Sequence, residues 1–137
     1  MKFLDTNIIL RYLTKDDPAK AEGCFELFQK LKAGSEEVFT CEAVVTEVVY
    51  VLSSKRLPYQ LSHEDIRSRL VPILNLRGLK IAQKRLYLRA LEHYVASPFL
   101  DIEDAVAIAH MEKLGIREII SYDTDFDRIP NLKRVEP

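Results

Sequence analysis

The sequence predicts an α/β protein, a three-layer α/β/α sandwich around a parallel sheet of about four to five strands. Two observations predict this class. Short apolar segments alternate with longer helical segments along the 137 residues, and no internal repeat or linker-like stretch interrupts the alternation. Such alternation implies right-handed crossovers between parallel strands, which are covered by helices on both faces. The length fits one domain, residues 1–137, with a single core.

The first segments predict a strand, a helix and a second strand. Residues 2–5 are a short apolar stretch and are expected to form the first strand. Asp17 and Pro18 supply an N-cap and a first-turn proline for a helix that is expected to end at Gly34. Residues 38–40, Val-Phe-Thr, predict the second strand.

The middle of the chain continues the alternation. A valine-rich helix is expected over about 42–56, and residues 62–65, Ser-His-Glu-Asp, predict a capping box that opens the next helix. Apolar residues after Gly78 predict a third strand. The helix that follows this strand is expected to stop near Ser97 and Pro98.

The carboxyl-terminal part predicts one more helix and two strands. The helix is expected over about 101–114, with Gly115 as its C-cap. Residues 119–122, Ile-Ile-Ser-Tyr, predict a strand, and Arg134 and Val135 suggest an edge strand. Because ligands bind at the carboxyl ends of the strands in such sheets, functional residues are expected there.

Composition and cysteine usage indicate a globular protein of the cytoplasm. Hydrophobic residues make up 47% of the chain and charged residues 30%, as in ordinary globular domains. Cys24 and Cys41 form no Cys-x-x-Cys motif and have no histidine at zinc-ligand spacing, which favours a reducing compartment. Asp5 and Arg11 interrupt the first apolar stretch, so we do not expect it to be a signal peptide. No apolar run approaches the ~18 residues of a membrane span.

The net charge is −1, but the charges are segregated along the chain. Residues 66–91 hold seven of the 20 basic residues and none of the 21 acidic ones. The seven are Arg67, Arg69, Arg77, Lys80, Lys84, Arg85 and Arg89. The acidic and basic residues are therefore expected to occupy different parts of the molecule.

Asp5 and Asp123 are the first candidate functional residues. Each follows an expected strand at its carboxyl end, so both belong to the edge where ligands bind. The alternative is that each aspartate caps the helix or turn that follows it.

Glu47 is expected to lie inside the apolar stripe of its helix. Ala43 and Val44 precede it by one turn, and Tyr50 and Val51 follow it by one turn. A buried and unpaired carboxylate costs several kcal/mol, so a cation, a partner charge or hydrogen bonds must compensate it. The alternative is a partly exposed glutamate at the edge of the stripe.

Asp104 repeats this pattern on the helix near the carboxyl terminus, with apolar residues one turn before and after it. Asp101 lies three residues behind on the same face, so both are expected to point inward, whereas Glu103 is expected to point to water. The alternative is that Asp104 only complements the helix dipole and that Asp101 is the N-cap.

Four carboxylates at one locus repel each other unless protons or a metal ion neutralise them. Hard divalent cations prefer oxygen ligands, and no His or Cys stands at a spacing that suits Zn²⁺. The inventory therefore predicts Mg²⁺ or Mn²⁺ and a metal-activated water that attacks a phosphodiester.

Four motifs follow one another along the chain: Asp5-Thr6-Asn7 after the first strand, Glu47 in Thr-Glu-Val-Val-Tyr-Val-Leu, Asp104-Ala105 on a late helix, and Ser121-Tyr-Asp123-x-Asp125-Phe near the end. In this order they resemble the PIN-domain nucleases, and most closely their short toxin branch, the VapC-like toxins. The resemblance covers essentially the whole chain.

The resemblance implies a metal-dependent endoribonuclease, often acting on structured RNA such as tRNA, with a cognate antitoxin and commonly a homodimer. The acidic quartet of the family corresponds to Asp5, Glu47, Asp104 and Asp123, which are therefore the expected catalytic and metal-binding residues. Supporting polar positions correspond to Thr6, Asn7 and Ser121. Two further acids, Asp125 and Asp101, match accessory positions that vary more.

The cationic segment is a candidate RNA surface, because an acidic site needs positive charge nearby to accept phosphates. Lys84, Arg85 and Arg89 are the expected contacts. The alternatives are an ordinary solvated helix face and a surface for acidic antitoxin residues. For the whole protein, the alternatives to a nuclease are a PIN-like RNA-binding or RNA-processing module with weak or no catalysis, and a metal-dependent phosphatase.

Overall fold

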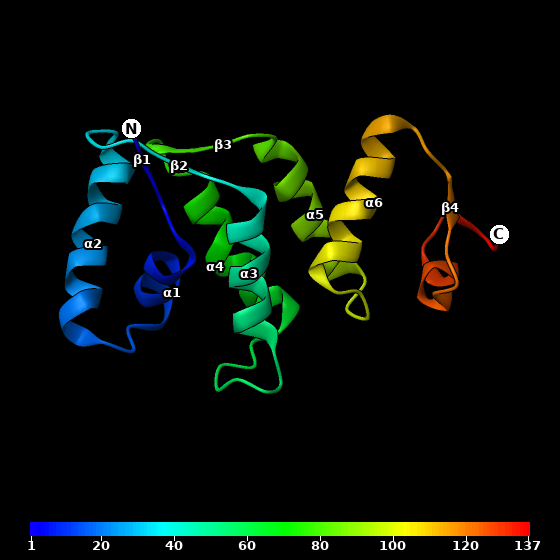
Figure 1. The fold of residues 1–137 in the computed structure, drawn as a ribbon, viewed down its shortest axis with the longest axis horizontal. Helices are drawn as coiled ribbons and strands as arrows, with labels where there is room; N and C mark the ends of the chain where they lie inside the picture. The colour runs from blue at the N-terminus through cyan, green and yellow to red at the C-terminus, as the bar shows by residue number, and fades with distance from the viewer. The chain divides into compact units, whose positions relative to one another are not determined.

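The computed structural model describes residues 1–137 and divides the chain into two compact units, Met1–Lys84 (unit 1) and Arg85–Pro137 (unit 2). The chain contains six α-helices, one short 3₁₀ helix and five strands (Figure 1). All strand pairs are parallel. The predicted α/β class with parallel strands is confirmed. None of the helices is both long and apolar enough to cross a membrane.

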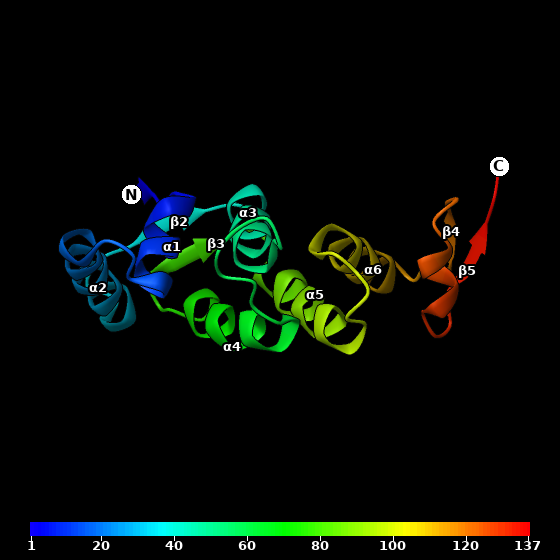
Figure 2. The ribbon, with the colours of Figure 1, turned by 90° about the horizontal axis from the view of Figure 1, so that it is seen from below.

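Unit 1 is built around a three-stranded parallel sheet in the order β1-β2-β3. Its elements are β1 (Lys2–Phe3), α1 (Thr6–Thr14), α2 (Pro18–Ala33), β2 (Val38–Thr40), α3 (Glu42–Ser53), α4 (His63–Leu74) and β3 (Leu79–Ile81). Val38 pairs with Lys2 on one side and with Leu79 on the other, so β2 is the central strand. The helices that precede β2 in the sequence, α1 and α2, and those that follow it, α3 and α4, lie around these strands (Figures 1 and 2).

The core of unit 1 comes from its helices and from β2 and β3. Leu31 of α2, Val48 of α3, Ile66 of α4 and Leu79 of β3 are each 0% exposed. Burial of such aliphatic side chains stabilises the unit by roughly 1.5–3 kcal/mol per residue. The core therefore holds α2, α3 and α4 against the strands. This packing fixes the position of the residues that follow β1 and of the outer face of α3.

The local signals in unit 1 were confirmed where a cap or a stop defines the helix end. Asp17 Oδ1 accepts the Lys20 N–H at 3.3 Å, and Gly34 ends α2 in the left-handed conformation with φ 78°. Ser62 Oγ accepts the Asp65 N–H at 3.1 Å and opens α4. The expected strand at 38–40 is present as β2.

Helix α1 was not predicted, because its β-branched first turn carries no strong helix signal. Packing on α2 supplies the missing stabilisation: the rings of Tyr12 and Phe28 stack with centroids 4.0 Å apart. The expected first strand is correspondingly shorter, because β1 ends at Phe3 and Asp5 is already the N-cap residue of α1.

Unit 2 contains two longer helices and a two-stranded parallel sheet. Its elements are α5 (Lys84–Ala96, beginning at the boundary), α6 (Ile102–Leu114), β4 (Glu118–Ile120), the 3₁₀ helix η1 (Thr124–Arg128) and β5 (Lys133–Val135). Ile119 of β4 pairs with Arg134 of β5. The expected C-cap Gly115 has φ 70° and ends α6, as predicted.

An apolar cluster joins α6 to the loop between β4 and β5. Leu100, Ile108 and Phe126 are its buried members, and partly buried apolar side chains such as Ile119 and Leu132 pack against it. The Arg128 guanidinium lies 3.7 Å from the centre of the Phe99 ring at the border of this cluster. The cluster therefore fixes η1, and with it the residues that follow β4, against α6.

Candidate functional site

In unit 1, the loop after β1 brings two predicted residues into contact. Leu4 N–H donates to the Phe39 carbonyl oxygen at 2.8 Å and holds the end of β1 against β2. The next residues turn into α1, where Thr6 is only 3% exposed. Its hydroxyl Oγ1 donates a hydrogen bond of 2.8 Å to Oε2 of Glu47 on α3. Thr6 therefore orients the Glu47 carboxylate from a buried and fixed position.

Asp5 and Asn7 stand on either side of Thr6, and both are exposed. Asp5 has the extended backbone of an N-cap residue, with φ −88° and ψ 160°, but its carboxylate accepts no capping hydrogen bond from α1. The capping alternative therefore does not account for the Asp5 side chain. Both of its carboxylate oxygens remain available to an external cation.

Glu47 is exposed, so our expectation that it lies inside the apolar stripe of α3 was wrong. The buried stripe consists of Val44, Val45, Val48, Val49 and Leu52. Glu47 borders this stripe on the side where Thr6 meets it, and the hydroxyl satisfies one carboxylate oxygen. The alternative of a partly exposed glutamate at the edge of the stripe is the one that the structure supports.

In unit 2, the start of α6 carries a cluster of acids. Asp101 is the N-cap residue, and its Oδ1 accepts the Asp104 N–H at 2.8 Å. Asp101 is exposed, so our expectation that it points inward was wrong: the capping bond holds the carboxylate at the helix end. Asp104 is half-buried and Glu103 is exposed, as expected for these two residues.

The pKa of Asp104 is raised from its ordinary value of 3.8 to about 6. Burial is the largest cause, and the charge of Asp101, a hydrogen bond with Asp101 and the charges of Asp123 and Glu103 add to it. The charge of Asp123 thus acts on Asp104 within unit 2. The ionised form of such a carboxyl group is stabilised by any cation that neutralises the neighbouring carboxylates.

The loop after β4 holds Asp123 through two short hydrogen bonds. The Asp123 N–H donates to Ser121 Oγ at 3.0 Å, and Asp123 Oδ1 accepts the Asp125 N–H at 2.9 Å as the N-cap of η1. The capping alternative therefore holds for one oxygen of Asp123. The predicted supporting residues Ser121 and Asp125 both contact Asp123, although Asp125 does so through its backbone.

Arg134 of β5 also contacts this loop, whereas the sequence suggested it only as part of an edge strand. Its guanidinium donates to the Ser121 carbonyl oxygen at 3.0 Å and to Asp127 Oδ1 at 3.0 Å. A third hydrogen bond, of 2.8 Å, reaches Glu136. Arg134 thus fixes both ends of the loop that carries Asp123. No local pattern indicates this role, because Ser121 and Arg134 are 13 residues apart.

The four acids of the predicted quartet are divided between the units, Asp5 and Glu47 in unit 1 and Asp104 and Asp123 in unit 2. Neither unit by itself contains a group of three or more His, Cys, Asp or Glu side chains arranged to hold a metal ion. The donor chemistry of each pair nevertheless fits a hard divalent cation, because every ligand atom is a carboxylate oxygen. The uncapped Asp5 and the raised pKa of Asp104 are the two observations that favour a bound cation.

The cationic segment 66–91 is less uniform than its sequence suggested. Arg89 forms a bidentate pair with Glu112 of α6, with nitrogen–oxygen distances of 2.7 and 2.9 Å, and this pair lowers the pKa of Glu112. Lys80 lies 3.9 Å from a carboxylate oxygen of Glu37. Arg85 is exposed and Lys84 is partly exposed. Arg89 is therefore ion-paired with an acid 23 residues away in the sequence, and its expected contact with RNA stays a prediction.

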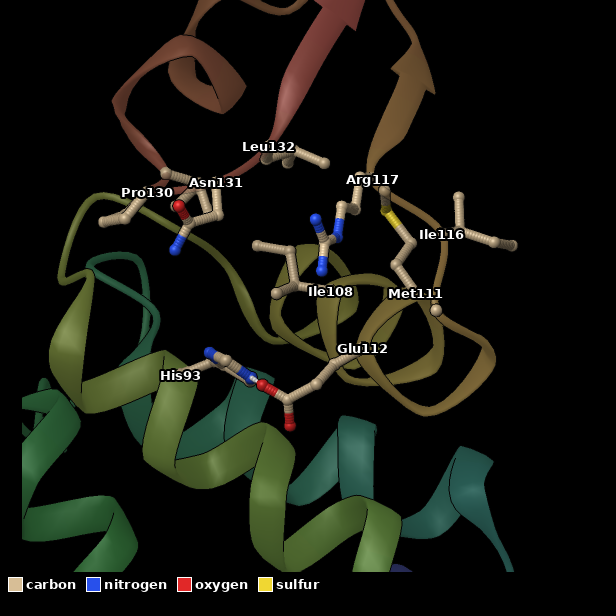
Figure 3. A pocket seen from close by; sticks show the side chains of 11 residues that line it. His93, Ile108, Met111, Glu112, Ile116, Arg117, Pro130, Asn131 and Leu132 are labelled. Atoms are coloured by element: carbon tan, nitrogen blue, oxygen red, sulfur yellow. Dashed lines mark ion pairs between the residues drawn. The ribbon is translucent and has the colours of Figure 1, made fainter.

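A pocket of about 300 Å³ in unit 2 lies at the other end of α6 from Asp104. Figure 3 shows His93 of α5 and Glu112 of α6 facing each other at its wall, with His93 Nε2 3.2 Å from Glu112 Oε2. Apolar side chains such as Ile108 and Leu132 complete the lining. This pocket contains none of the predicted site residues.

The comparisons with known proteins agree with the fold. The family model of the PIN domain matches residues 2–132, so the chain belongs to the PIN domain family. It is also similar to a VapC ribonuclease from Aquifex aeolicus (strain VF5), with 30% identity over 139 aligned residues. That alignment covers 100% of this chain and 97% of the relative. The resemblance to PIN-domain nucleases of the VapC type is thereby confirmed.

Proposed function

We propose that this protein is a Mg²⁺- or Mn²⁺-dependent endoribonuclease and the toxin of a toxin–antitoxin pair that acts in the cytoplasm. The observation that carries the proposal is the Thr6–Glu47 hydrogen bond of 2.8 Å beside the uncapped Asp5. A buried donor that orients an exposed carboxylate is typical of a site that binds a cation rather than of a solvated surface. The full-length similarity to a VapC ribonuclease supports RNA as the substrate.

Each residue has a defined part in this proposal. Asp5, Glu47, Asp104 and Asp123 would hold the metal, which when bound activates a water molecule and neutralises the phosphate. Thr6 orients Glu47, and Ser121 together with the Asp125 N–H holds Asp123 in place. Asp101 fixes the first turn of α6 and therefore the position of Asp104. Asn7 is exposed beside Asp5, where it can contact the substrate.

The metal requirement can be tested with dialysed protein and a labelled RNA. We expect cleavage only after addition of Mg²⁺ or Mn²⁺, and a higher melting temperature with the metal, because a ligand that binds only the folded state stabilises it. Asp5→Asn should remove both effects. Asp65→Asn, at an exposed position in the first turn of α4, is the matched control and should keep both. Metal-independent cleavage by the parent would refute the coordination scheme.

RNA binding without cleavage by the metal-loaded parent would instead favour a PIN-like RNA-binding or RNA-processing module with weak or no catalysis. Hydrolysis of a small phosphate ester in preference to RNA would indicate a phosphatase. We also propose a cognate antitoxin and a homodimer as partners. Co-purification with the product of the adjacent gene and light scattering of the purified chain would test them.

A further inference from the structure

An open pocket of about 540 Å³ lies along α1 and α2 in unit 1, and we call it the α1–α2 pocket. Its volume falls in the range of small-ligand sites, about 300–1,000 Å³. α1 contributes Asn7, Ile8 and Arg11, and α2 contributes Lys20, Gly23, Cys24 and Leu27. The lining therefore combines an apolar wall with three side chains that can donate hydrogen bonds to an anion.

Gly23 is the first indication that this pocket has an occupant. It lies in the interior of α2, where glycine destabilises a helix relative to alanine. A Cβ atom added at Gly23 would meet nothing within 4 Å, and its backbone is not in the left-handed region. Neither packing nor conformation within the protein requires glycine here. The missing side chain instead leaves room for a group to approach the α2 backbone from outside.

Charge is the second indication. Arg11 and Lys20 line the pocket, and the nearest acids to Arg11 are only loosely paired with it: Asp16 Oδ1 lies at 3.5 Å and Asp17 Oδ2 at 3.9 Å. The Lys20 side chain is exposed and forms no ion pair. Two cations beside an apolar wall suit a ligand that is anionic at one end and apolar at the other.

The third indication is position. Asn7 belongs to the lining of the pocket and also to the loop that carries Asp5, two residues before it. Arg11 follows Asn7 by four residues on α1, so both lie on one face of the helix. A chain bound at Asp5 would therefore continue directly into the pocket.

We propose that the α1–α2 pocket holds one nucleotide of the RNA substrate, with its base against Gly23 and its phosphate at Arg11 and Lys20. A nucleotide has the required combination, because its base presents an apolar face and its phosphate carries the negative charge. This inference rests on the proposed function, which brings the scissile phosphodiester to Asp5. It makes Arg11, Lys20 and Gly23 residues that position the substrate next to the bond that is cleaved.

RNA binding can be measured without cleavage in the Asp5→Asn background, with a labelled single-stranded RNA hexamer and fluorescence anisotropy. Gly23→Leu fills the pocket, and we expect it to weaken binding at least tenfold, whereas Gly23→Ala should have a smaller effect. Gln29→Leu places the same side chain at an exposed position of α2 outside the pocket and should bind like the parent. Melting temperatures of the leucine variants show that α2 remains folded.

Lys20→Gln tests the phosphate contact separately. The slope of log affinity against log salt should fall by about 0.7, the value for one phosphate on a single strand. In the cleavage-competent protein, which retains Asp5, Gly23→Leu should raise KM for the hexamer and leave kcat unchanged. Unchanged hexamer binding and KM in folded Gly23→Leu would overturn the proposal, even if the parent cleaves RNA.

The failure of the proposed function has a different signature. If the parent binds the hexamer but does not cleave it, and Gly23→Leu still weakens binding, the pocket stands and the nuclease proposal falls. If Gly23→Leu abolishes binding of a labelled glutamate-rich peptide but leaves binding of the RNA hexamer unchanged, the pocket binds an acidic protein partner, and the nucleotide assignment is wrong.

Discussion

The two units hold their acids in different ways. In unit 1, Glu47 is exposed and a buried neutral hydroxyl, that of Thr6, orients it. In unit 2, Asp104 is half-buried, and this burial together with the charges of neighbouring carboxylates raises its pKa to about 6. The first arrangement fixes geometry with little electrostatic cost. The second accumulates negative charge that a proton or a cation must relieve.

This difference teaches that a folded chain can hold a carboxylate either by a hydrogen bond from a buried hydroxyl or among other carboxylates whose charges raise its pKa. The capping bonds show the same contrast. Asp5 stands at an N-cap position without using its carboxylate there, whereas Asp101 and Asp123 each commit one oxygen to a backbone N–H. Substitutions in the two units should therefore change activity and stability in different proportions.

The largest effect is expected for Glu47→Gln, which keeps the shape of the side chain and an oxygen that can accept from Thr6. Cleavage of RNA should fall by more than about 100-fold, because Glu47 is a proposed metal ligand and the loss of a ligand costs at least as much as the loss of an outer partner. The melting temperature without metal should stay the same or rise. A variant that is less stable but retains full activity would show that the role of Glu47 is structural.

A smaller effect on activity is expected for Thr6→Val, which removes the hydroxyl and preserves the side-chain volume. We expect a loss of about 10–100-fold in cleavage and of about 1 kcal/mol in the free energy of unfolding. Thr6→Ser, which keeps the donor, should recover much of the activity. If Thr6→Ser and Thr6→Val are equally inactive, packing of the methyl group matters more than orientation of Glu47.

Asp104→Asn tests the electrostatic cost in unit 2 in metal-free buffer. The pKa of Asp104 in the folded protein is about 6, above the ordinary value of 3.8, so the folded state binds this proton more tightly than the unfolded state does. The stability that this group contributes is present below about pH 4 and is lost as the pH rises to 6.

The Asn variant should therefore unfold at a higher temperature than the parent at pH 7, and the difference should disappear near pH 4. Because water screens a half-buried group, we expect about 1 kcal/mol, which corresponds to a few degrees for a chain of this size. Calorimetry in EDTA at the two pH values measures it. A difference that is the same at both pH values would show that the carboxyl charge is not the cause.

The smallest effect is expected for the cationic segment. Arg89 differs there from Lys84 and Arg85, because it is ion-paired with Glu112. The double variant Lys84→Ala and Arg85→Ala should reduce the salt slope of RNA binding by about 0.7 for each phosphate contact that is lost. Arg89→Ala should leave this slope unchanged, because Glu112 already neutralises its charge. An unaltered slope in the double variant would mean that these residues face solvent or a protein partner.

Part of the predicted site was accessible from the sequence because it depends on local order along the chain. Asp5 and Asp123 were recognisable from their positions after apolar strands, and Asp104 from the start of a capped helix. The pairing of Glu47 with Thr6 was not, because 41 residues separate them. Nor was the neutralisation of Arg89 by Glu112, which are 23 residues apart. These interactions exist only after the helices have packed.

By itself, the sequence determined the helices whose ends are defined by local capping or stop residues. The N-caps Asp17 and Ser62 and the left-handed stops Gly34 and Gly115 act within a few residues, so they define α2, α4 and α6 in any context. Only the tertiary structure decided that residues 6–14 become a helix. Its β-branched first turn has weak helix propensity, and the helix is stabilised by packing on α2 rather than by signals of its own.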